Sequence, residues 1–215
     1  MALRFLIAMR LVLAHCSVPI VLHAFAQAPE VRLRAELERI REQDQADRHA
    51  VHDYTTGPQK DSVIAHMARQ DSLDLVRVTF IIDSAGWLGE DVIGQQANQA
   101  LFLVIQHADR QPDVQARYLP VMREAVANGA ARANELAMLE DRVRVNAGRE
   151  QLYGSQIGWK DDKPFVRPIE DEVHVNERRA SVGLEPLEKY AERFGIQWTQ
   201  PVERPRVLLF GPTTP

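Results

Sequence analysis

The sequence predicts an all-α fold, a helical bundle-like single domain, on three observations. Apolar residues recur through most of the chain at the three- and four-residue spacing of amphipathic helices. Three such segments between residues 91 and 147 are joined by short turns, which favours antiparallel neighbours in a bundle. No segment alternates apolar and polar residues for long enough to require a β-sheet.

The N-terminal half is expected to be helical with one long break. A helix begins at Pro29, because proline is tolerated in the first helical turn. The polar stretch Asp44–Lys60 is predicted to contain the end of this helix and a loop. A second helix covers about 61–82 and is terminated by Gly86, the first of three glycines in a turn region that extends to Gly94.

The next three helices end at proline or glycine. They are expected over about 91–110, 112–128 and 131–147, ended by Pro112, Asn128-Gly129 and Gly148 respectively. An irregular loop follows around 149–168, then two short helices over roughly 171–181 and 186–194. The Pro-containing tail 196–215 is expected to be extended. We divide the chain into an N-terminal helical extension (27–70), the main domain (71–195) and this tail.

Residues 1–26 are typical of a secretory signal peptide. A short basic start precedes an apolar stretch, and the small-x-small triplet at 24–26 predicts cleavage between Ala26 and Gln27. The apolar run is too short for a retained membrane anchor, so we expect a periplasmic or secreted protein. Cleavage also removes Cys16, the only cysteine, and leaves a chain without disulfides or thiolate chemistry; Cys16 lies in only a poor lipoprotein box.

The composition excludes some functions. The 215 residues are 45% hydrophobic with net charge −4, and loss of Arg4 and Arg10 with the leader moves the charge to −6. Without a basic field or interleaved aromatic and basic residues, nucleic acid is not an expected partner. His49 and His52 share a helix face but have no third ligand at diagnostic spacing, so no metal or other cofactor is predicted. The sequence makes no prediction about protein partners.

Polar residues on apolar helix faces are the first candidates for chemistry. Projection of the 91–110 segment as a helix places Asn98, His107 and Asp109 inside the apolar arc, whereas Gln106 lies in the polar wedge. Asp141 likewise lies on a weakly apolar face of the 131–147 segment. A buried carboxylate needs a cation or several donors. We expect its partner to be His107, Arg178, Arg179 or the amides of the irregular loop.

The irregular loop could build a recognition surface for a polar ligand. Its segment Gln151–Gln156 carries two side-chain amides, a phenol, a hydroxyl and a glycine that permits close backbone approach. The alternative is structural: Tyr153 would plug the bundle, and Gln156 would cap helix ends.

Several of these motifs together resemble the bacterial domain of unknown function 6624. The resemblance covers about 72–192 and is carried by these segments: Gly86-Trp87, Gln106-His107-Ala108-Asp109, Leu119-Pro120, Asp141-Arg142, Gln151–Gln156, Pro168-Ile169 and Arg178-Arg179. Leu88 and Ser155 depart from it, where proline and threonine are usual. The resemblance implies an all-helical domain whose motif residues are His107, Asp109, Asp141, Arg142, Tyr153 and Gln156; it implies no activity.

Two functional hypotheses follow. In the first, the protein is a hydrolase-like enzyme or small-ligand binder, with the catalytic residues His107 as general base, Asp141 as its orienting carboxylate and Tyr153 as a donor. Binding residues would be Gln106, Asp109, Arg142, Gln156 and Arg178. In the second, a non-catalytic envelope-associated module uses the same residues as a buried network that fixes helix packing. Metal binding by His107 and Asp109 with a further carboxylate is a third, weaker alternative.

Overall fold

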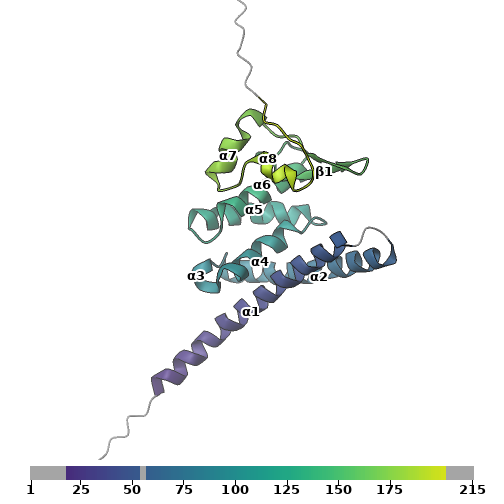
Figure 1. Cartoon of the computed structure of the whole chain (residues 1–215). Coiled ribbons are helices and arrows are strands. Elements are labelled where there is room, and N and C mark those ends of the chain that lie inside the picture. Colours follow the sequence, from purple (N-terminus) through teal and green to yellow (C-terminus); the bar gives the residue numbers. More distant parts are fainter. Residues whose placement is uncertain (1–17, 54–56, 202–215) are drawn as a thin grey trace, which may run out of the picture.

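The structure, a computed structural model, describes residues 18–53 and 57–201 (Figure 1). It confirms a mainly all-α single domain, with eight α-helices and one β-hairpin in these residues. The helices are α1 (Val18–Asp53), α2 (Pro58–Ala85), α3 (Glu90–Ile93), α4 (Gln95–Gln106), α5 (Pro112–Ala127), α6 (Ala133–Asn146), α7 (Val175–Ser181) and α8 (Leu187–Glu192). The strands are β1 (Ile157–Lys160) and β2 (Lys163–Val166), and a 3₁₀ turn, η1, covers Glu172–His174.

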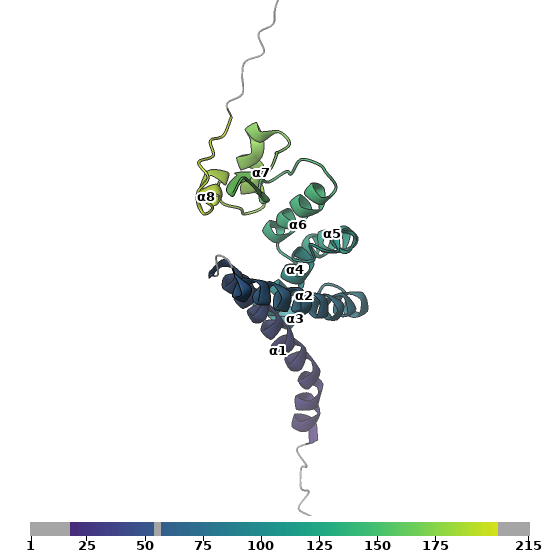
Figure 2. The same ribbon diagram turned by 90° about the vertical axis from the view of Figure 1, so that its right-hand side faces the viewer.

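The elements are stacked in chain order (Figures 1 and 2). The α1–α2 pair lies at one end, α4, α5 and α6 lie in the middle, and the hairpin, α7 and α8 lie at the other end. Helix α4 packs against both α1 and α2, and α5 packs against α6. The main core is centred on fully buried residues of α4 such as Leu101 and Ile105, whereas a small second core around Val175 and Leu187 supports the C-terminal end.

The break expected at Asp44–Lys60 is much shorter than predicted. Helix α1 continues to Asp53 and α2 begins at Pro58. The stretch does contain a helix end and the break before the next helix, but most of it is helical, because Asp44 and Asp47 lie on the buried face of α1, where they continue the line of Leu37 and Ile40. Their polarity hid the helical periodicity of this segment.

The helix expected over 91–110 is divided. Gly94, with a φ of 79°, separates α3 from α4, and α4 ends at Gln106. A tight turn then leads to Pro112, the first residue of α5. Since Asp109 lies in this turn and not on a helix, its side chain is exposed, contrary to the prediction, whereas Asn98 is buried as expected.

The irregular loop contains a short β-hairpin that the sequence did not predict. Strands β1 and β2 are only four residues long, and the turn is made by Asp161 and Asp162, both with positive φ. Positive φ at both central residues is the requirement of a type I′ turn, whose twist matches that of the flanking strands. The predicted helices at 171–181 and 186–194 are present as η1, α7 and α8.

The predicted leader falls mostly outside the described residues. Cys16 lies there, as does the tail beyond residue 201. The predicted cleavage site at Ala26/Gln27 lies within the backbone of α1. Within residues 18–53 and 57–201, no helix combines the length and apolarity that crossing a bilayer requires.

Candidate functional site

The structure divides the predicted site residues between two separate polar clusters. His107 belongs to a cluster where the end of α4 meets α1 and α2, whereas Asp141 belongs to a cluster between α6 and the loop after it. No hydrogen bond joins His107 to Asp141 in the described part of the chain. The pairing of these two residues that the sequence suggested is therefore not found.

The Asp141 cluster is buried and closely paired. The carboxylate accepts hydrogen bonds from the backbone amides of Leu152 (2.6 Å), Tyr153 (3.0 Å) and Ser155 (2.9 Å), and from the Ser155 hydroxyl (2.9 Å). Burial raises the pKa of Asp141, and these four donors oppose the shift because they stabilise the carboxylate. Of the partners expected from the sequence, the loop amides are the ones observed.

The remaining residues of this cluster hold the loop in place. Arg178 donates to the carbonyl oxygens of Leu152 (2.9 Å) and Glu170 (2.6 Å), and the buried Arg179 donates to that of Tyr153 (2.6 Å). The Gln156 amide donates to the Ser155 hydroxyl oxygen (3.0 Å). Tyr153 contributes to this network through its backbone, so the cluster supports the fold of the loop.

Gly154 shows how closely the loop packs. Its φ is 72°, and a Cβ atom on it would lie 2.9 Å from both methyl groups of Leu187 and 3.0 Å from Ile169. The glycine predicted to permit close approach therefore brings the loop against the small C-terminal core.

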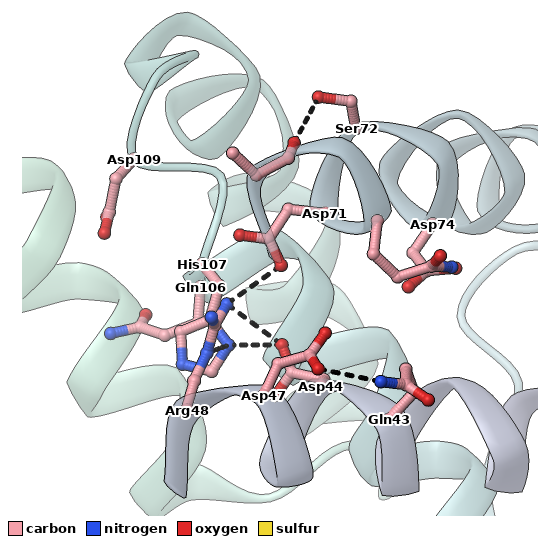
Figure 3. A network of polar contacts seen from close by, with 12 residues as sticks. Gln43, Asp44, Asp47, Arg48, Asp71, Ser72, Asp74, Gln106, His107 and Asp109 are labelled. Atoms are coloured by element: carbon pink, nitrogen blue, oxygen red, sulfur yellow. Dashed lines mark hydrogen bonds and ion pairs between the residues drawn. The ribbon is translucent and has the colours of Figure 1, made fainter. Parts of the chain in front are cut away.

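The His107 cluster is formed where α4 ends. His107 is the first residue after the helix, with φ −91° and ψ 4°, and its amide still donates to Leu103 (2.9 Å). This position directs the imidazole toward α1, where Nδ1 lies 2.8 Å from Oδ1 of the buried Asp44 and 2.8 Å from Nε of Arg48 (Figure 3). Arg48 also approaches Asp44 (3.0 Å) and Asp71 on α2 (3.2 Å).

These two contacts to Nδ1 exclude one another. When Nδ1 carries the proton it donates to Asp44, and when it does not it accepts from Nε of Arg48. The opposite nitrogen, Nε2, has no hydrogen-bond partner in the described residues and is reached by solvent. The first arrangement leaves a basic lone pair on Nε2, and the second makes Nε2 a hydrogen-bond donor.

The two carboxylates that contact Arg48 differ in their pKa. For Asp44, burial favours the neutral form, but the hydrogen bond from His107 and the charges of His107 and Arg48 outweigh it, and the pKa is lowered. For Asp71, burial and the charge of Asp44 raise the pKa despite Arg48. Shifts in opposite directions at neighbouring carboxylates are common where acid–base chemistry takes place.

A cleft of about 390 Å³ lies beside this cluster. One wall comes from α1 and α2, including Arg48, Asp71 and the apolar Met67, and the other is the turn from His107 to Gln111. The volume suits a small molecule, and the lining mixes apolar surface with a few polar groups, as ligand sites do. His107 thus lies at the edge of a cleft, in contrast to Asp141.

Three predicted binding residues lie around the turn. Asp109 lines the cleft and pairs with Arg142 of α6. Gln106 was expected on the polar face of its helix but is buried, and its side-chain oxygen has no partner in the described residues. Only His107 and Asp109 of the predicted site residues line this cleft.

Sequence reasoning missed Asp44, Arg48 and Asp71. The available signal was the helical spacing of Asp44 and Arg48 from Ile40, which places polar side chains on the buried face of α1. Among the described residues, no group of three or more His, Cys, Asp or Glu side chains is arranged to hold a metal ion.

Comparisons with known proteins return one finding. Searches of curated proteins and of solved structures give no match. A family of unknown function (DUF6624) matches residues 31–197, which include α1 from residue 31 onward and all of α2 as well as the segment carrying the sequence motifs. The chain belongs to the DUF6624 family of unknown function.

Proposed function

We propose that this protein is an enzyme that uses acid–base catalysis on a small polar molecule, most simply a hydrolase, with His107 as the general base. The observation that carries the proposal is the geometry of one ring: Nδ1 is held by a buried carboxylate, and Nε2 faces solvent beside a cleft without a partner. A carboxylate that fixes the proton on Nδ1 leaves Nε2 free to accept a proton from water or substrate.

The neighbouring residues have complementary roles. Asp44 orients the imidazole and stabilises the imidazolium when it forms, because its lowered pKa keeps it ionised. Asp71 lines the cleft, contacts Arg48 and has a raised pKa, so it is the second titratable group of this cleft beside His107. Arg48 contacts both carboxylates. Its Nε, which lies 2.8 Å from Nδ1 of His107, moves away from the ring when the imidazole takes up a positive charge.

The Asp141 cluster is better explained as structural. Its carboxylate is saturated by four donors, and Arg178 and Arg179 bind backbone carbonyls. The second hypothesis, in which a buried polar network fixes the packing, therefore describes the Asp141 cluster. We propose that Asp141 and Tyr153 position the loop and have no part in the reaction.

The reactivity of His107 tests the proposal without knowledge of the substrate. Diethyl pyrocarbonate acylates unprotonated imidazole nitrogens, and mass spectrometry of peptides gives the rate at each histidine. His66 on α2 is an internal reference, since its side chain is 57% exposed against 19% for His107. We expect His107 to react at least as fast as His66 at pH 7, because its Nε2 has no hydrogen-bond partner in the described residues and His107 lines the cleft.

The Asp44→Asn variant completes this experiment. Loss of the carboxylate should slow acylation of His107 at least threefold and leave His66 unchanged, with a thermal melt to verify folding. A His107 rate below one tenth of the His66 rate in the native protein would overturn the proposal, whatever the variant does.

We also propose that the protein is exported. The support is the sequence of residues 1–26, which has the charge, apolar run and cleavage triplet of a signal peptide. Mass measurement of the protein recovered from its host should give an N-terminus at Gln27. A mature protein that retains Met1–Ala26 would contradict export by this route.

A further inference from the structure

The geometry points to a second binding site, a cleft between α6, the β-hairpin and α8 that takes a ring-bearing organic anion. This cleft, which we call the hairpin cleft, has a volume of about 310 Å³. It is distinct from the cleft of about 390 Å³ that His107 lines. The residues that define it for this argument are Arg142, Trp159, Arg167 and Phe194. The proposal does not depend on the chemistry proposed for His107.

The hairpin presents an aromatic side chain to this cleft. Side chains alternate between the two faces of a strand, so Ile157 and Trp159 share one face, together with Pro164 and Val166 opposite them. Both Ile157 and Trp159 line the cleft. Trp159 is 67% exposed, which leaves a large flat ring available to stack on a ligand.

The opposite wall of the hairpin cleft is rigid. The Tyr190 hydroxyl donates to the Ser155 carbonyl (2.9 Å), and its ring packs edge to face with Phe194 at a centroid separation of 5.3 Å. Phe194 remains partly exposed at the rim. Trp159 and Phe194 therefore both offer aromatic surface to a ring-bearing ligand in this cleft.

The charge of the hairpin cleft favours an anion. Arg142 and Arg167 line it, and no Asp or Glu does so among the described residues. The Arg167 side chain is exposed and has no ion-pair partner in the described part of the chain. Arg142 pairs with Asp109 through one terminal nitrogen, but its buried Nε has no acceptor there. In a protein with net charge −4, this local excess of arginine is suited to a carboxylate or phosphate.

The ligand class is thus an anionic group attached to a ring with an apolar face that can stack on an aromatic side chain. An aromatic carboxylate, through its flat ring, and a sugar acid, through the C–H face of its chair-shaped ring, share this chemistry, and probes can distinguish them. Phenylacetate and glucuronate are the anionic probes, and phenylacetamide and glucose are their neutral counterparts. Isothermal titration of the full chain, supported by saturation-transfer NMR, measures binding.

We expect one of the anions to bind with a Kd of about 1 mM and at least tenfold more tightly than its neutral counterpart. Tighter binding of phenylacetate would identify an aromatic acid, and tighter binding of glucuronate would identify a sugar acid. Equal affinity for the anions and their neutral counterparts, or no binding of either anion, would overturn the inference.

Three variants locate the site. Arg167→Gln and Trp159→Ala alter exposed side chains of the hairpin cleft and should each weaken binding at least fivefold. Lys163→Gln is the matched control, because Lys163 is a cation of the same hairpin that lies on the face opposite Trp159. Binding that is unchanged in Arg167→Gln, or weakened equally in Lys163→Gln, would place the anion elsewhere and contradict the proposal.

Discussion

Replacement of Asp141 by asparagine tests the structural account of the loop. The carboxylate supplies two oxygens: Oδ1 accepts from the amides of Leu152 and Tyr153, and Oδ2 accepts from the amide and hydroxyl of Ser155. Asparagine has nearly the same shape but keeps only one acceptor oxygen. Its NH₂ group would face the Ser155 N–H, so two donors would meet.

The size of the effect follows from these contacts. One buried N–H without an acceptor costs about 1–3 kcal/mol, and the remaining hydrogen bonds weaken by about 1 kcal/mol when the acceptor loses its charge. Relief of the buried charge, which raises the pKa of Asp141, offsets part of this. After this offset, we expect Asp141→Asn to lower the free energy of unfolding by about 1–3 kcal/mol, or the midpoint by roughly 2–12 °C for a chain of this length.

Thermal unfolding followed by circular dichroism measures this change. Asp109→Asn is the matched control, because Asp109 is an exposed carboxylate with an ion pair to Arg142, and such pairs contribute about 0–1 kcal/mol. Hydrogen exchange should also show faster exchange at the Ser155 amide in Asp141→Asn. A midpoint within 2 °C of the native protein would refute the reasoning that this carboxylate holds the loop.

Three further predictions concern other residues. Glu135 is 4% exposed, and burial raises its pKa to about 7, so the stability it contributes in the neutral form is lost as pH rises from 4.5 to 7. The free energy of unfolding of Glu135→Gln, measured in urea, should therefore rise relative to that of the native protein by up to about 3 kcal/mol between pH 5 and pH 8. A difference that does not depend on pH would contradict this. Gly154→Ala should cost about 2–4 kcal/mol, since its Cβ would be strained at positive φ and 2.9 Å from Leu187; a loss under 1 kcal/mol would contradict the packing. Asp44 has a lowered pKa, so its stabilisation is present at pH 7 and lost as pH falls through the folded-state pKa. The deficit of Asp44→Asn at pH 7 should accordingly shrink below pH ~4, and a deficit that grows in acid would oppose the assignment.

Much of the fold could be predicted because it depends on local patterns. The C-caps of α2, α5 and α6 are Gly86, Asn128 and Ala147, which are at or next to the stops predicted at Gly86, Asn128-Gly129 and Gly148. The hairpin was missed because its strands are short and its turn uses Asp161-Asp162 in place of a glycine-containing pair. Elements of this size have too few residues to show a period of two.

The candidate site could be predicted only in part. His107 and Asp141 were recognised as polar residues that need partners, and both have them. The choice of partner depends on tertiary packing: Asp44 lies 63 residues from His107 along the chain. Because Asp44 and Arg48 interrupt an apolar helix face, the same polarity that makes them useful concealed them from a search for periodicity.

The tautomer of His107 tests the central claim most directly. The two contacts at Nδ1 allow either proton position. If Nδ1 had no proton, its lone pair would repel the buried carboxylate of Asp44. If Nδ1 carries the proton, Arg48 loses only its Nε contact to the ring and keeps its ion pairs with Asp44 and Asp71. We therefore predict the neutral tautomer with the proton on Nδ1 and a free lone pair on Nε2. Long-range ¹H–¹⁵N correlation spectra of the imidazole distinguish the two nitrogens. A proton on Nε2, with Nδ1 accepting from Arg48, would contradict the assignment of His107 as the general base.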